Sequence, residues 1–165
     1  MPNWIEGCMK IRGSQKNVHT FLTNAFEYVN GKWVDGKYVV EKDETAFSEE
    51  VYDDYCSEIS VRDGSHLIGS RRAFINGSAY AYIEDISSDK EISEALELKQ
   101  AWGWFDEEFY KSLSDKYNID IRLIGWEMGM EYKGELEVLR GHDPTYKETK
   151  YDDWRWEAEC PLLGG

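Results

Sequence analysis

Residues 4–31, WIEGCMKIRGSQKNVHTFLTNAFEYVNG, decide how the chain begins to fold. Residues 4–12 mix apolar and polar side chains without proline, which predicts a strand, and Gly13-Ser14 ends it. Ser14 is a suitable helix N-cap, and Asn30-Gly31 is a typical helix stop. Between them, apolar residues recur at helical spacing: Val18, Phe21, Leu22, Ala25, Phe26 and Val29. We therefore expect a strand followed by a helix that runs to about residue 29.

An Asp-Gly pair beyond this helix predicts a β-hairpin. Asp35-Gly36 stands between the apolar runs Trp33-Val34 and Tyr38-Val39-Val40, and such a pair favours a two-residue turn. The first forty residues thus predict the order strand, helix, strand, strand.

Further along, the sequence predicts strands and one more clear helix. Apolar residues four apart from Phe47 to Ile59 suit a helix, or a helix that runs into a strand near residues 56–62. Asn76-Gly77 predicts a second hairpin. Other expected elements are a strand at 95–100, a helix at 105–117 with acids in its first turn, and strands at 119–126, 132–138 and around 154–156.

Hairpins outnumber crossovers in this pattern. We therefore expect one α+β domain over residues 1–165, with a mostly antiparallel sheet and helices packed on one face, in a ferredoxin-like manner. The 165 residues, of which 41% are hydrophobic and 15% aromatic, suffice for one core.

The net charge limits the possible partners. Lys and Arg number 19 against 33 Asp and Glu, so the formal charge is −14, which disfavours direct binding to nucleic acid or to an anionic membrane. No apolar run approaches the ~20 residues of a membrane span, and the start lacks the pattern of a signal peptide. A cytoplasmic protein is expected.

The acidity is concentrated in one region. An acidic, insertion-like segment at about 41–94 follows a slightly basic beginning, and its densest part is residues 41–63. If residues 47–58 form a helix, four acids share a stripe at i, i+4 spacing, where like charges destabilise. A cluster retained at that cost indicates a binding surface, with a merely solvated face as the alternative. The predicted partner-binding residues are Glu49, Glu50, Asp53, Asp54 and Glu58.

Four short motifs are similar to those of one protein family. They are Met1-Pro2-Asn3-Trp4, Ala101-Trp102, Trp126-Glu127-x-Gly129 and Gly134-Glu135. With them the chain resembles phage and plasmid proteins of the YubB ferredoxin-like type, over about half its length. Ile5 replaces the usual Cys, and residues 41–94 have no counterpart in the family. The resemblance implies a ferredoxin-like α+β fold and a mobile-element origin, and it implies no reaction.

No motif indicates a cofactor or a metal ion. His19, His66 and His142 are far apart, and the three cysteines are isolated, whereas zinc sites need closely spaced ligands. Residues 31–38 approach a phosphate-loop pattern, but Tyr38 stands where Ser or Thr must bind magnesium.

One pair of acids offers an enzymatic alternative. Glu127 and Glu131 lie beside Trp126 and Tyr132, and two carboxylates next to aromatic rings are the requirement for cleaving a glycosidic bond. The alternative function is therefore an enzyme or binding module for a glycan or another small polar ligand.

The favoured hypothesis is a non-enzymatic phage or mobile-element protein that binds a basic, nucleic-acid-handling host protein and inhibits it. Carboxylates spaced along an element approximate the phosphates of a nucleic acid, so a basic groove accepts one in place of the other. A host defence nuclease such as a CRISPR effector is the concrete partner, which makes the chain an anti-CRISPR candidate. A third hypothesis is a phage accessory protein whose acidity only confers solubility.

Overall fold

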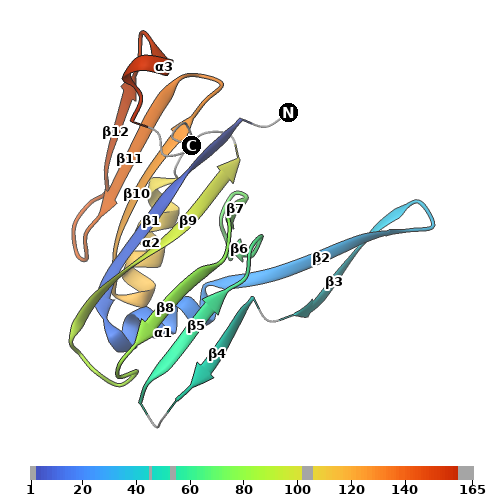
Figure 1. Cartoon of the computed structure of the whole chain (residues 1–165), viewed down its shortest axis with the longest axis vertical. Helices are drawn as coiled ribbons and strands as arrows, with labels where there is room; N and C mark the ends of the chain where they lie inside the picture. The colour runs from blue at the N-terminus through green and yellow to red at the C-terminus, as the bar shows by residue number, and fades with distance from the viewer. Residues whose placement is uncertain (1–2, 45, 53–54, 102–105, 160–165) are drawn as a thin grey trace.

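The computed structural model describes residues 3–44, 46–52, 55–101 and 106–159 (Figure 1). These residues form twelve strands and three helices. In order they are β1 Trp4–Ser14, α1 Gln15–Asn24, β2 Phe26–Val34, β3 Lys37–Glu44, β4 Phe47–Val51, β5 Ser57–Val61, β6 His66–Leu67, β7 Ala73–Ile75, β8 Ala79–Ile83, β9 Glu91–Ala101, α2 Glu107–Tyr117, β10 Asp120–Glu127, β11 Tyr132–Val138, β12 Thr145–Lys150 and α3 Trp154–Glu157.

The strands form two sheets. The larger has nine strands in the order β12-β11-β10-β1-β9-β7-β6-β2-β3, and the smaller has the order β4-β5-β8. The strand pairs in both sheets are antiparallel. The β2-β3 hairpin projects from the rest of the molecule (Figure 1). The α+β class and the mostly antiparallel sheet are confirmed, whereas a ferredoxin-like arrangement with its helices on one face is not established.

The beginning of the chain follows the sequence prediction up to the end of α1. Ser14 caps the helix, because its hydroxyl oxygen accepts a hydrogen bond from the Asn17 amide at 3.2 Å. The predicted continuation of the helix to residue 29 is wrong. α1 ends at Asn24, and Phe26 opens β2 opposite Leu67. The ring of Phe26 packs edge-on against the ring of Phe21, with 5.5 Å between the ring centroids. Phe26 is therefore buried in the core although it lies in a strand and not in the helix.

The two predicted hairpins have different outcomes. Asp35-Gly36 forms the β2-β3 turn as expected, and both residues have the positive φ (49° and 75°) of a type I′ turn. The Asn76-Gly77 hairpin is wrong, although both of its arms are strands. β7 pairs with β6 and β9 in the large sheet, while β8 pairs with β5 in the small one. The turn therefore carries the chain between the two sheets.

The helix expected from Phe47 is also wrong. Residues 47–51 form β4, and Ser57, Ile59 and Val61 of β5 are buried at every second position, which is the period of a strand. The strand predicted near residues 56–62 is confirmed. The strand expected around 154–156 is replaced by the short helix α3, and the last strand is β12.

The middle of the second half agrees with expectation. β9, β10 and β11 occupy the predicted strand regions. Asp106 is the N-cap of α2, and its carboxylate accepts a hydrogen bond from the Phe109 amide at 3.1 Å. Asn118, in the left-handed conformation, is the C-cap. Glu107 and Glu108 lie in its first turn, where their negative charges interact favourably with the positive end of the helix dipole.

Both sheets share one hydrophobic core. Helix α1 contacts β1 and β9 of the large sheet and β5 of the small one, and α2 contacts β10 and β11. Buried residues from both sheets and both of these helices form a single cluster, which includes Met9, Phe21, Ile59, Ala81 and Leu123. Each sheet consequently has a face toward this core and a face away from it.

Candidate functional site

The face of the small sheet that points away from the core carries acids and tyrosines. Ile59, Val61, Ala79, Ala81 and Ile83 of β5 and β8 are buried, so the residues between them point outward. We call this surface the acidic tyrosine face and define it by Glu50, Tyr52, Glu58, Tyr80 and Tyr82. Its three tyrosines are 54–61% exposed, which is unusual for large aromatic side chains and indicates a surface available for binding.

Strand register places the two acids of this face against each other. Glu50 of β4 lies directly opposite Glu58 of β5, and Glu58 lies opposite Tyr82 of β8. Like charges at directly opposed positions destabilise a sheet. The Tyr52 hydroxyl donates to a Glu58 carboxylate oxygen at 3.0 Å, and this hydrogen bond raises the pKa of Tyr52. The tyrosine is thereby held beside the acids.

The structure separates the sequence-predicted acids. Glu50 and Glu58 share the acidic tyrosine face, but Glu49 is on the opposite side of β4, where its carboxylate lies 2.8 Å from His19 Nε2 of α1. The predicted helical stripe is therefore wrong, because neighbouring strand residues point to opposite faces. Asp53 and Asp54 lie outside the described residues.

Sequence reasoning missed the tyrosines of this face. The signal was present in residues 79–83, Ala-Tyr-Ala-Tyr-Ile, where Tyr80 and Tyr82 alternate with small or apolar residues. That alternation predicts a half-buried strand with tyrosines on one side. Finding that side exposed required knowing that β8 lies in a second sheet.

The pair Glu127 and Glu131 has a different geometry from that of a catalytic pair. Glu127 is only 3% exposed, and its carboxylate accepts hydrogen bonds from the amides of Gly129 at 3.0 Å and Met130 at 2.5 Å. Glu131 is exposed and has a φ of 57° in the same turn. Glu127 thus stabilises the β10-β11 turn.

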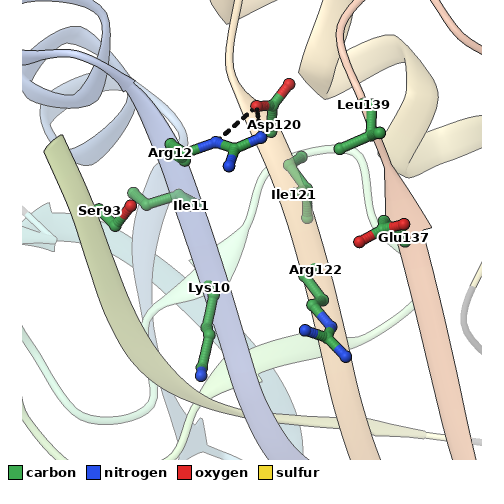
Figure 2. A pocket seen from close by; sticks show the side chains of 9 residues that line it. All are labelled: Lys10, Ile11, Arg12, Ser93, Asp120, Ile121, Arg122, Glu137 and Leu139. Atoms are coloured by element: carbon green, nitrogen blue, oxygen red, sulfur yellow. Dashed lines mark hydrogen bonds and ion pairs between the residues drawn. The ribbon is translucent and has the colours of Figure 1, made fainter. Parts of the chain in front are cut away.

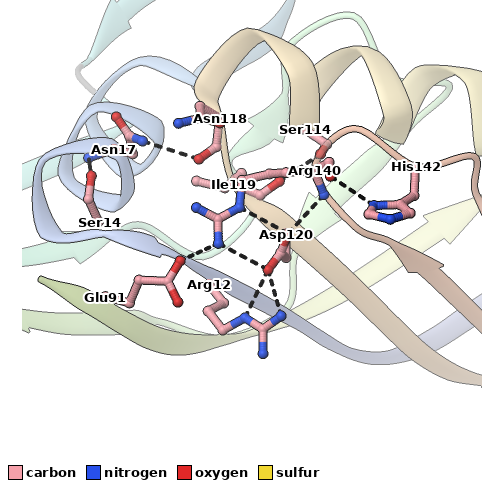
Figure 3. A network of polar contacts seen from close by, with 10 residues as sticks. All are labelled: Arg12, Ser14, Asn17, Glu91, Ser114, Asn118, Ile119, Asp120, Arg140 and His142. Atoms are coloured by element: carbon pink, nitrogen blue, oxygen red, sulfur yellow. Dashed lines mark hydrogen bonds and ion pairs between the residues drawn. The ribbon is translucent and has the colours of Figure 1, made fainter. Parts of the chain in front are cut away.

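A cluster of charged side chains connects the end of β1 with the start of β10 (Figure 3). It consists of Arg12, Glu91, Asp120 and Arg140. Asp120 accepts hydrogen bonds from Arg12 Nη2 at 2.7 Å and from the Arg140 amide at 2.9 Å, and Arg140 also contacts Glu91. Burial alone raises the pKa of Asp120, but the hydrogen bonds from Arg140 and Arg12 outweigh it and lower the pKa to about 2. The Asp120 carboxylate is therefore ionised and holds both arginines.

Each of the three histidines has a polar atom of another residue within hydrogen-bond distance of its ring. His19 pairs with Glu49, His66 Nδ1 lies 3.2 Å from a Glu27 carboxylate oxygen, and His142 Nδ1 lies 2.9 Å from the Arg140 carbonyl. Within residues 3–44, 46–52, 55–101 and 106–159, no group of three or more His, Cys, Asp or Glu is arranged to hold a metal ion.

Comparisons of the chain with protein-family models, with curated proteins and with solved structures find no match. Among the helices in the described ranges, none is long and apolar enough to cross a membrane.

Proposed function

We propose that this chain is a non-enzymatic protein that binds a basic, nucleic-acid-handling host protein through the acidic tyrosine face and inhibits it. The observation that carries the proposal is the opposed pair Glu50 and Glu58, flanked by exposed Tyr52, Tyr80 and Tyr82. A repulsive pair on an otherwise regular sheet weakens the fold, and a positively charged partner relieves the repulsion.

Tyrosine and acid together suit a protein interface. Tyrosine is enriched among the residues that dominate binding energy, because a large rigid ring covers much surface while its hydroxyl forms hydrogen bonds. Acids around such rings select a basic partner and accelerate encounter. The formal charge of −14 adds a long-range attraction to the same class of partner.

Inhibition follows if the partner's basic groove normally holds a nucleic acid. Opposed side chains on neighbouring antiparallel strands are about 5 Å apart, which is comparable to the charge spacing of about 3.4 Å along one nucleic-acid strand. A host defence nuclease, such as a CRISPR effector, is the partner we propose. The resemblance to YubB ferredoxin-like proteins supports this choice, since it implies a mobile-element origin.

The double variant Glu50→Gln, Glu58→Gln tests the face directly. We expect about tenfold weaker binding to the partner isolated with the wild-type chain, since two charged contacts are lost. The melting temperature is expected to stay the same or rise, because the opposed charges are removed. Biolayer interferometry measures the binding, and thermal unfolding followed by circular dichroism measures the stability.

The matched control is Asp143→Asn, Asp152→Asn, which removes the same charge from exposed positions away from the small sheet. It is expected to leave the affinity within about twofold of wild type, because only the screened long-range field changes. Equal losses in both double variants mean that net charge alone acts. An unchanged affinity in the Glu50, Glu58 variant removes this face from the interface.

Salt dependence tests the electrostatic part of the proposal separately. Raising the salt from about 50 mM to about 500 mM shortens the Debye length from about 14 Å to about 4 Å. The affinity for the partner is expected to fall at least tenfold, with most of the change in the association rate. An affinity that does not respond to salt indicates an apolar interface instead.

A further inference from the structure

The face of the nine-stranded sheet that points away from the core has two hollows along β1. Met9 and Ile11 are buried, so Cys8, Lys10 and Arg12 point to the other side of the strand. One hollow, of about 180 Å³, has Lys10, Arg12 and Arg122 in its wall (Figure 2). The other, of about 370 Å³, adjoins Cys8 and Ile124. Lys10 and Cys8 are two residues apart, so the hollows follow one another along the strand.

The first hollow is lined by three cations, Lys10, Arg12 and Arg122, and by two acids, Asp120 and Glu137. Lys10 of β1 lies directly opposite Arg122 of β10, and both extend in the same direction in Figure 2. Both side chains are exposed, and neither forms an ion pair with any described residue. Glu137 of β11 lies directly opposite Arg122 on its other side, but the two side chains form no ion pair, so Lys10 and Arg122 remain available to an anionic ligand.

Arg12 completes the cationic end in a fixed position. Its guanidinium is bound by Asp120, with Nε at 2.8 Å and Nη2 at 2.7 Å, while its side chain remains 53% exposed. The ion pair with Asp120 therefore fixes the position of the Arg12 guanidinium. Its neighbour on β9 is Ser93, whose hydroxyl can donate a further hydrogen bond to a ligand.

The walls of the second hollow are mostly apolar. Ile124, Trp126 and Ala95 line it together with Cys8, and Glu6, Glu97 and Asn76 also contribute to the lining. Burial raises the pKa of the Cys8 thiol, in keeping with an apolar surrounding. A hollow with aliphatic and indole walls accepts a flat or compact apolar group.

We propose that the two adjacent hollows, together called the groove below, bind an organic anion with an apolar, preferably aromatic, body. The anionic group binds Lys10 and Arg122, and the body lies against Ile124 and Trp126. Residues 122 and 126 are four positions apart on one strand, about 14 Å, which is long enough for a small ring system and its acidic group. The groove lies on the other sheet from the acidic tyrosine face, so this inference is independent of the proposed function.

Naphthalene-2-sulfonate is a suitable probe, because it joins a flat apolar body to a permanent negative charge. Titration followed by ¹H–¹⁵N NMR, with the Trp126 indole signal assigned through Trp126→Phe, is expected to shift that signal. The expected dissociation constant is on the order of 1 mM or tighter, from the binding energy per atom of small ligands. Inorganic sulfate and neutral 2-naphthalenemethanol are each expected to bind at least about tenfold more weakly.

The double variant Lys10→Gln, Arg122→Gln is expected to weaken binding of the probe at least about tenfold. Lys16→Gln, Lys37→Gln removes the same charge from exposed positions elsewhere and is expected to leave the affinity within about twofold. The melting temperature of the Lys10, Arg122 variant is expected to be retained or to rise by a few degrees, as like charges are removed. Retained stability shows that a loss of binding is not a loss of fold.

Three outcomes overturn the inference. The first is equal binding of the neutral analogue, which means that only an apolar surface is present. The second is equal loss of affinity in both double variants, which means that net charge alone attracts the probe. The third is a titration in which signals of the β1, β9 and β10 amides and of Trp126 do not move.

Discussion

Gly7→Ala is expected to destabilise the chain by about 4 kcal/mol. A Cβ at residue 7 would stand 1.9 Å from the carbonyl oxygen of Ile124 and 2.5 Å from Cα of Gly125. Both are backbone atoms of β10, which pairs with β1 from Ile5 to Arg12. Relief of the clash therefore requires β1 and β10 to separate at the centre of the large sheet.

Urea denaturation measures this loss, with Gly36→Ala as the control. Gly36 also resists substitution, because its φ is +75°, but an added Cβ there meets no atom within 4 Å. The control is expected to lose only about 1 kcal/mol, the strain of a left-handed residue. A Gly7→Ala variant no less stable than Gly36→Ala contradicts the close approach of β1 and β10.

Asp120→Asn is expected to lower the free energy of unfolding by about 2 kcal/mol at neutral pH, and the loss is expected to depend on pH. The side chain is 10% exposed and holds Arg12 and Arg140. Its folded pKa of about 2 lies below the ordinary value of 3.8. A lowered folded pKa means that the ionised form stabilises the fold fully above about pH 5, and that this contribution disappears as the pH falls toward 2.

The measurement is the difference in unfolding free energy between wild type and Asp120→Asn at several pH values. The difference is expected to be constant from pH 7 to about 5 and to shrink toward zero near pH 2. Asp115→Asn is the control, since Asp115 forms an exposed i, i+4 pair with Lys111, and its expected effect is below about 0.5 kcal/mol. A difference that is the same at pH 6 and pH 2 contradicts the proposed charge-dependent role of Asp120.

Local chemistry explains which parts of the fold were predictable. The Ser14 cap, the Asp35-Gly36 turn and helix α2 with its Asp106 cap all depend on hydrogen bonds or φ values within a few residues. Those signals are contained in the segment itself, so they survive any tertiary arrangement. The strands β9, β10 and β11 were equally visible through alternating apolar residues.

The failures occur where distant partners decide. Phe47, Val51, Tyr55 and Ile59 are four apart, but burial of Ile59 between β4 and β8 favours strands, and Val51 and Tyr55 are exposed. Phe26 lies in β2 and not in the predicted helix, because it pairs with Leu67 of β6. The arms of the Asn76-Gly77 turn pair with β9 and β5 instead of with each other. Propensity is weak against such packing.

In the candidate sites too, the residue types follow from the sequence, whereas their arrangement depends on contacts between distant segments. The sequence by itself determined the acidity, the presence of Glu50 and Glu58, and the alternation of Tyr80 and Tyr82. Only the tertiary structure decided that β4, β5 and β8 place these residues on one face and send Glu49 to the other. It alone set Lys10 opposite Arg122, residues far apart in the chain. Strand register is a non-local property, because it depends on which backbone groups across the sheet satisfy each other and which faces are buried together.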